Sequence, residues 1–252
     1  MQRVLNFFAF RNLALLFCLT LAATACQPIQ PESLQSGQSG SNTLAKSMPQ
    51  NLQPGQWHNQ SLDFLIKNSS IEELEFATES MLTDLMVHMN GQPGHPTANG
   101  DIVNQLIEFI PANGLNQPTL EMMDASLSTV SDAGIFSAEL SNLVETLWSL
   151  GKNNAPVEDL ESVIAQIENT EWTGIDQMAA FYLVDTYYAS FDYWSTNDPE
   201  SIENKKPYIA DAVGAFVGYG LAALGGTTAI LMPWAGYVTG AMFSFIYDAL
   251  PI

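Results

Sequence analysis

Three histidines are the side chains best suited to hold a metal ion or to transfer protons: His58, His88 and His95. A zinc site needs three or four ligands at converging positions. The sequence has neither an H-E-x-x-H nor an H-x-x-x-H spacing, and it has no usable cysteine. We therefore predict no metal site and no cofactor. We interpret His58 as a helix-start residue that bonds backbone groups.

Two carboxylates, Asp185 and Asp192, are spaced so that they share one helix face with Tyr188. Partly buried carboxylates beside aromatic rings can act as acids, or can bind a sugar together with the rings. They can also form a polar seam that accepts hydrogen bonds from Tyr and Trp side chains. The sequence contains no G-x-S-x-G elbow, phosphate loop, dinucleotide fingerprint or calcium loop. We predict no catalytic residue, and keep a hydrolase that uses Asp185, Asp192 or the histidines as a third function class.

The elements that carry these residues are predicted to be helices. Ser70 and Glu73 form a capping box for one of them, and Gly151 is expected to end another as a C-cap. Segment 174–194 is apolar on most sides and rich in aromatic residues, which is typical of a helix in the centre of a bundle. No strand pattern occurs, so the sequence predicts an all-α multi-helix bundle. Apolar residues recur at helical spacing in segments 57–67, 102–110, 119–130, 138–150 and 157–167.

The most distinctive element is an apolar C-terminal stretch, residues 207–250. No charged side chain occurs between Asp211 and Asp248, and Gly225-Gly226 and Pro233 interrupt the run, so we predict two helices folded into a hairpin. Small residues at every fourth position place a glycine-zipper stripe on one helix face, where another backbone can approach closely. These residues are Gly214, Gly218, Ala222, Gly226, Gly236, Gly240 and Ser244.

This hairpin has two interpretations. In the first it is buried in a soluble bundle, and its glycines allow tight packing against the aromatic helix. In the second it leaves the bundle and enters a bilayer, as the hairpin of pore-forming bacteriocins does. Each arm would be about 26 Å long at 1.5 Å per residue, which is marginal for a hydrocarbon core of ~30 Å. The sequence leaves both interpretations open.

Residues 1–25 have the pattern of a secretory signal peptide, with an apolar core followed by Ala23-Thr24-Ala25 as a cleavage motif. The next residue, Cys26, completes a sequence that resembles the lipobox of bacterial lipoproteins. We expect acyl chains on Cys26 to anchor the mature protein to a lipid membrane. Gln, Pro, Ser and Gly dominate residues 26–56, which we predict to be a disordered tether. The helical domain then spans 57–252.

Charge limits the partners. The chain has 7 Lys+Arg against 27 Asp+Glu, and Arg3 and Arg11 are its only arginines. Recognition of phosphate relies on Lys and Arg, so the composition argues against nucleic-acid binding. Gln27 after the cysteine, in place of Asp, favours the outer membrane of a Gram-negative cell.

A family resemblance rests on short motifs at the two ends of the helical part. Gly55, His58 and Asn59 form a G-x-x-H-N start, and the segment from Ala210 to Gly218 is a glycine-rich helix near the end. This order resembles a group of uncharacterised secreted bacterial proteins with a G-x-x-H-N start and a glycine-rich C-terminal helical pair. The resemblance implies architecture and no catalytic residue.

These observations lead to one expected function and one alternative. We predict a cell-envelope lipoprotein, secreted across the inner membrane and anchored in the outer membrane, with a non-enzymatic interaction or structural role. Its expected partners are the lipid membrane, through acylated Cys26, and an envelope protein. The alternative is a membrane-active, bacteriocin-like protein that forms pores with the C-terminal hairpin.

Overall fold

The computed structural model describes residues 52–68, 79–92, 119–226 and 231–249, together with the isolated positions 104, 105 and 108. These residues are 85% helical and contain no strand, which confirms the all-α prediction. All of them belong to one compact unit, Asn42–Ile252. The predicted signal peptide, Cys26, most of the predicted tether and the predicted capping box at Ser70 lie outside the described residues, as does nearly all of segment 102–110.

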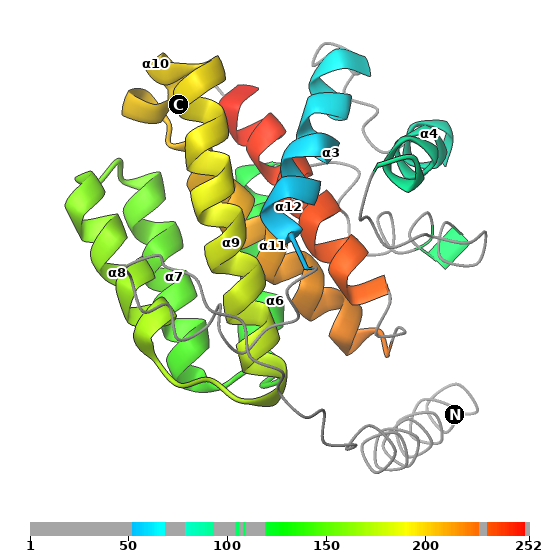
Figure 1. The fold of residues 1–252 in the computed structure, drawn as a ribbon. Coiled ribbons are helices and arrows are strands. Elements are labelled where there is room, and N and C mark those ends of the chain that lie inside the picture. Colours follow the sequence, from blue (N-terminus) through cyan, green and yellow to red (C-terminus); the bar gives the residue numbers. More distant parts are fainter. Residues whose placement is uncertain are drawn as a thin grey trace, which may run out of the picture. The chain divides into compact units, whose positions relative to one another are not determined.

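Figure 1 shows the described helices of this unit, and from α6 to α11 they follow one another with short connections. In chain order they are α3 (Pro54–Asn68), α4 (Glu79–Asn90), α6 (Leu120–Asp132), α7 (Ala138–Lys152), α8 (Val157–Asn169), α9 (Gly174–Asn197), α10 (Pro199–Asn204), α11 (Pro207–Leu224) and α12 (Leu231–Ala249).

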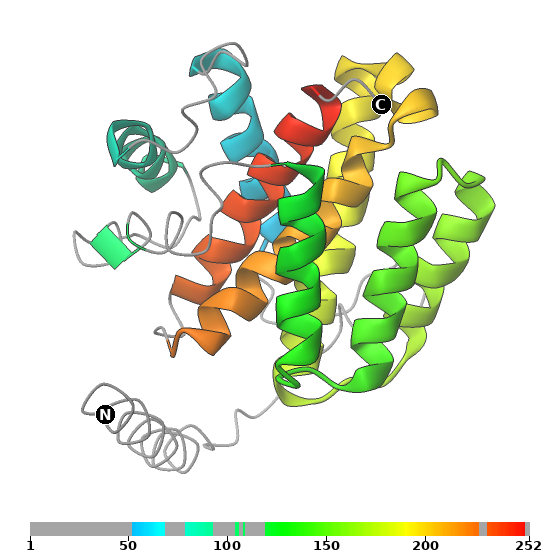
Figure 2. The same cartoon turned by 180° about the vertical axis from the view of Figure 1, so that it is seen from behind.

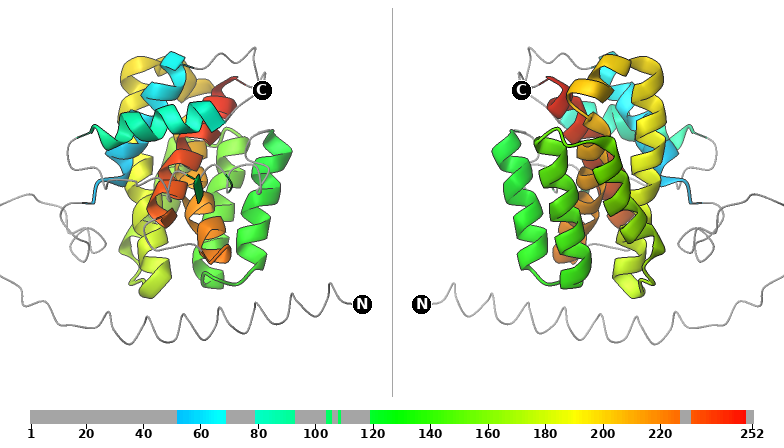
Figure 3. Two further views of the ribbon diagram at one scale, coloured as in Figure 1. Left: turned by 90° about the vertical axis from the view of Figure 1, so that its right-hand side faces the viewer. Right: turned by 90° about the vertical axis from the view of Figure 1, so that its left-hand side faces the viewer.

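Helix α11 lies at the centre of the domain. It packs along α12 and against α9, and it also contacts α6 and α7. Helix α3 packs against both α9 and α12, and α6 to α8 lie on the other side of α11 from α3 (Figures 2 and 3). Every residue of α11 from Pro207 to Ala222 is buried. The apolar hairpin is therefore the layer around which the other helices pack.

Small residues let α11 and α12 approach each other closely. A Cβ atom added to Gly214 would lie 2.8 Å from the Cα of Gly240, and one added to Gly218 would meet the backbone oxygen of Ala235. A Cβ atom on Gly236 would lie 3.1 Å from the backbone oxygen of Ala215. At these points a side chain on the glycine would occupy space already filled by the partner helix.

The predicted glycine stripe divides between the two helices and the turn. Gly214, Gly218 and Ala222 are buried on α11, and Gly236, Gly240 and Ser244 are buried on α12. Gly226, in contrast, is exposed and has a φ of 65°, so it forms the turn after α11 and takes no part in the packed face.

The prediction that Gly151 ends a helix as a C-cap is wrong. Gly151 lies within α7, and a Cβ atom added there would be 2.7 Å from Cγ2 of Ile209. The residue is therefore needed for the close contact between α7 and α11, while Asn153 is the C-cap.

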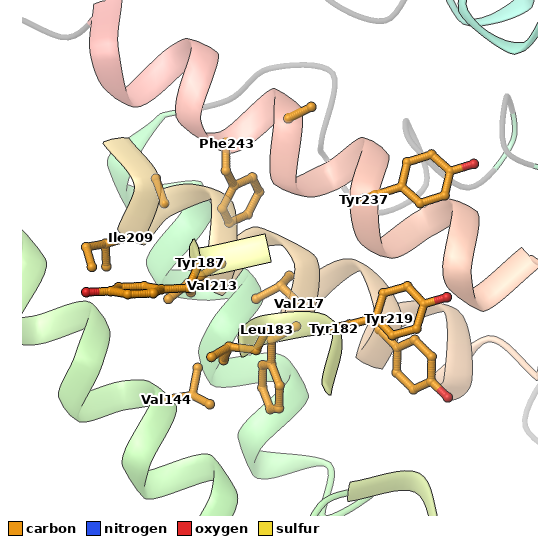
Figure 4. Close-up of a cluster of buried hydrophobic side chains, with 14 of the residues drawn as sticks. Val144, Tyr182, Leu183, Tyr187, Ile209, Val213, Val217, Tyr219, Tyr237 and Phe243 are labelled. Carbon is orange, nitrogen blue, oxygen red and sulfur yellow. The ribbon is translucent and has the colours of Figure 1, made fainter. Parts of the chain in front are cut away.

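Aromatic side chains of α9 fill the space beside α11, as its apolar character predicts. Tyr187 makes an edge-on contact with Tyr208 at 5.3 Å between ring centroids, and Tyr182 lies 5.4 Å from Tyr219. Figure 4 shows side chains of α7, α9, α11 and α12 gathered in this cluster, with Val144 contributed by α7. Burial raises the pKa of Tyr219 to about 12.

Helix α3 begins three residues before the predicted start at Trp57. Residues 54–56, which the prediction assigned to the tether, are therefore part of a helix. Pro54 suits the first helical turn because its missing N–H needs no partner there. Gly55 is buried against α9, and a Cβ atom on it would lie 2.5 Å from Cβ of Ala189.

Candidate functional site

A buried polar cluster joins α3, α9 and α11. His58 Nε2 lies 2.6 Å from Oδ1 of Asp211, and the side chains of both residues have no exposed surface. The other oxygen of Asp211 accepts hydrogen bonds from the Ser190 hydroxyl and from Trp194 Nε1, the latter at 3.0 Å. Three donors from two helices therefore surround one carboxylate inside the apolar core.

The hydrogen-bond partners define how many protons the pair of His58 and Asp211 holds. Asn59 donates its Nδ2 to the backbone oxygen of Ala189 at 2.9 Å, so its Oδ1 faces Nδ1 of His58 at 3.0 Å. Nδ1 must then carry a hydrogen. A second proton lies between Nε2 and the carboxylate. The pair is net neutral, which makes its complete burial energetically acceptable.

The glycine stripe gives His58 the room to reach Asp211. A Cβ atom on Gly240 would lie 3.1 Å from Cδ2 of His58 and 2.8 Å from the backbone oxygen of Asp211. The interpretation of His58 as a residue that bonds backbone groups at the helix start is therefore wrong. Its ring instead bonds two side chains, and its partner Asp211 is 153 positions away in the sequence.

The hydrogen bonds among Ser190, Asp211 and His58 differ from those of a catalytic triad, in which the nucleophile bonds its base. The Ser190 hydroxyl donates to Asp211 and not to His58, whereas an activated serine bonds the histidine. Ser190, like the other two residues, has no exposed surface. This cluster connects helices, and its geometry gives no route for a substrate to the serine.

A polar groove of about 660 Å³ lies between α3 and α9, next to the buried cluster. Asn59 belongs to both, since it lines the groove and bonds His58. The groove is lined by Gln53, Gln56, Asn59, Gln60, Asp63, Asp185, Ala189, Asp192, Tyr193, Thr196 and Asn197.

Two carboxylates of the groove are held by defined partners. Asp185 Oδ2 accepts a hydrogen bond of 2.7 Å from the Gly55 N–H, and burial raises the pKa of Asp185 even though this bond lowers it. Burial also acts to raise the pKa of Asp63, but hydrogen bonds from Lys67 and Tyr193 outweigh it and hold this pKa below its usual value. Those two bonds use both oxygens of Asp63.

The structure brings Asp185 and Asp192 together and separates Tyr188 from them. Both carboxylates line the groove, because positions seven apart differ by only about 20° around a helix. Tyr188 instead donates to Oε2 of Glu168 on α8, at 3.3 Å. The predicted face of α9 therefore contains the carboxylates, with Tyr193 as its aromatic member.

The histidines do not converge where they are described. His58 is enclosed by the buried cluster, and His88 on α4 lies with its ring 5.2 Å from that of Phe64. His95 lies outside the described residues. Within the part of the chain that the structure describes, no group of three or more His, Cys, Asp or Glu side chains is placed to hold a metal ion.

Comparison of the chain with protein-family models, with curated proteins and with solved structures gave no match. The resemblance to secreted proteins with a G-x-x-H-N start therefore stays a prediction. In this chain, the three residues that define that start do have distinct roles: Gly55 bonds Asp185, His58 bonds Asp211, and Asn59 bonds both α9 and His58.

Proposed function

We propose that this protein is a lipid-anchored protein of the cell envelope, and that its helical domain has a non-enzymatic binding role. Acylated Cys26 and the following tether hold the domain at the membrane surface. The C-terminal hairpin is the internal support of the domain and does not enter the bilayer. An envelope component outside the membrane is the expected partner.

The enclosure of the hairpin is the observation that supports the part of this proposal that keeps the hairpin out of the bilayer. Buried residues make up 89% of α11. The charged residues that flank the apolar run are both held by other helices: Asp211 bonds His58, and Asp248 Oδ1 accepts from the Ser201 hydroxyl of α10 at 2.5 Å. Insertion into a bilayer would have to separate Asp211 from His58, which leaves an uncompensated charge in an apolar environment.

Membrane activity is the second candidate, and one observation favours it. Among the described helices, α11 is the one that is long and apolar enough to cross a membrane. A core helix of a soluble protein has the same properties, and the burial of α11 is what such a helix shows. Membrane activity requires that α11 leave the bundle, so it predicts leakage of vesicles.

Two measurements on the full chain test the proposal. Cell fractionation should find the wild type with the membranes and the Cys26→Ala variant in the soluble fraction, because the variant lacks the acylated thiol. The purified Cys26→Ala chain should leave dye-loaded liposomes intact at pH 7 and pH 4.5. A variant that stays in the membrane fraction would contradict the acyl anchor, and dye release would support membrane activity by the hairpin.

A further inference from the structure

We propose that the groove between α3 and α9 binds a neutral, polyhydroxylated ligand, which in chemical terms is an oligosaccharide. The inference rests on the proposed binding role of the domain and identifies the class of ligand. It is carried by the size of the groove, by the chemistry of its lining and by the fixed geometry of its floor.

The residues that line the groove are nearly all polar in type, and most of them can both donate and accept hydrogen bonds. The volume of about 660 Å³ lies within the range of small-molecule sites. Amides and hydroxyls both donate and accept, as do the hydroxyls of a sugar, so the two sets are complementary. Ala189 is the one aliphatic residue, while Tyr193 adds an aromatic ring. The amide side chains are those of Gln53, Gln56, Asn59, Gln60 and Asn197.

Other classes of ligand fit this lining less well. No Lys or Arg lines the groove and three carboxylates do, so an anion would be repelled. The negative charge that the groove offers to a cation is smaller than the number of its carboxylates suggests. Lys67 already pairs with Asp63, and burial raises the pKa of Asp185, which disfavours its charged form. Asp192 is exposed, so of the three carboxylates it is the one that is neither paired with Lys67 nor buried as Asp185 is.

Gln60 gives the groove an acceptor that needs a donor. Its Oε1 atom is buried and has no hydrogen-bond partner among the described residues. A buried acceptor in this condition is unfavourable, and rotation of the Gln60 side chain toward the groove would let Oε1 accept a hydrogen bond from a ligand hydroxyl.

The floor of the groove is held in place before any ligand arrives. Asn59 is fixed by its bonds to the Ala189 backbone oxygen and to His58, and Asp185 is fixed by the Gly55 N–H. These contacts tie α3 to α9 and to the buried cluster. A ligand therefore has to immobilise few side chains when it binds. The small entropy cost favours binding of a hydroxylated ligand, whose individual hydrogen bonds each contribute little.

Isothermal titration of the full Cys26→Ala chain tests the inference. The probes are chitotetraose and maltotetraose as neutral oligosaccharides, with spermidine as a cation. We expect at least one oligosaccharide to bind. Gln60→Leu should weaken its binding about tenfold, because it removes the buried amide. Asp192→Asn should change it only slightly, since Asn keeps an acceptor while losing the charge. Asn142→Ala is the control, in a smaller groove of about 490 Å³ between α7 and α8.

Several results would overturn the inference. The first is the absence of oligosaccharide binding, and the second is a loss of binding in Asn142→Ala as large as that in Gln60→Leu. The third is that spermidine alone binds and that Asp192→Asn abolishes its binding, which would make this a cation site. Circular dichroism confirms that each variant is folded. A chain that is anchored through Cys26 and leaves liposomes intact, yet binds no oligosaccharide, would contradict this inference and leave the proposed function standing.

Discussion

At the scale of single residues, Asp211 explains how the apolar hairpin accommodates a charge. Its carboxylate lies at the start of α11 and is surrounded by His58, Ser190 and Trp194. The sequence shows both His58 and Asp211, and a buried charge must have a partner. It does not show which partner, because the two residues are 153 positions apart in the sequence and meet only through the packing of α3 and α11 against α9 and α12.

A double-mutant cycle measures the coupling between these two residues. His58→Leu should lower the free energy of unfolding by about 3–5 kcal/mol, because the buried Asp211 carboxyl loses the ring that completes the neutral pair. Asp211→Asn should also destabilise the protein. The double variant should lose less than the sum of the two single variants, by about 1 kcal/mol or more. Urea unfolding measures all four proteins, and additive losses would show that the contact contributes nothing.

Asp185→Asn tests the groove carboxylate through its pH dependence. The pKa of Asp185 in the folded protein is raised above its ordinary value of 3.8, so the folded state favours the protonated form. That stabilising contribution is complete below pH 3.8 and is lost as the pH rises through the folded pKa. Asn resembles the protonated form and can still accept from Gly55. The melting temperature of the variant should exceed that of the wild type at pH 7.

The same difference in melting temperature should disappear as the pH falls below 3.8, where the wild-type carboxyl is protonated in both states. Asp192→Asn is the matched control, because it removes the same charge from an exposed position of the same groove. A lower melting temperature for Asp185→Asn at pH 7 would mean that the ionised carboxylate stabilises the fold.

At the scale of helices, the spacing of apolar residues predicted where the helices lie in the sequence. It did not predict which helices contact one another. The helices predicted at 138–150 and 157–167 match α7 and α8 within two residues at each end, because each buries one apolar stripe. Gly151 and Gly55 show the limit. The sequence predicts Gly151 as a C-cap, but it belongs to the last turn of α7, and Gly55 belongs to the first turn of α3. Both glycines provide close contacts with other helices. Only the packed structure supplies that reason.

A graded pair of substitutions tests the contact between α11 and α12. Gly218→Ala should reduce stability by about 1–3 kcal/mol, because its Cβ would meet the backbone oxygen of Ala235 and neither backbone can move away easily. Gly236→Ala should cost less, since its Cβ would lie 3.1 Å from the nearest atom. Urea unfolding of both variants gives the comparison. Stabilisation by both, as expected for Ala in an unconstrained helix, would refute the close packing.

At the scale of the whole molecule, the protein combines an acidic composition with an apolar centre. The formal net charge of −20 favours solubility, and the hairpin that looks membrane-active in the sequence is enclosed by α3, α6, α7 and α9. Sequence alone left both interpretations of the hairpin open, because a buried core helix and a membrane helix have the same composition. In this structure the surrounding helices enclose the hairpin, which is the arrangement that the buried interpretation predicts.

Hydrogen exchange of the full Cys26→Ala chain, with and without liposomes at pH 7 and pH 4.5, tests most directly that the hairpin is a closed core. Amides of Pro207–Leu224 and Leu231–Ala249 should exchange as slowly as those of α9, through global unfolding alone, and liposomes should not change their rates. Faster exchange in the hairpin while α6 to α8 stay protected, or a change in its rates with liposomes, would contradict the account.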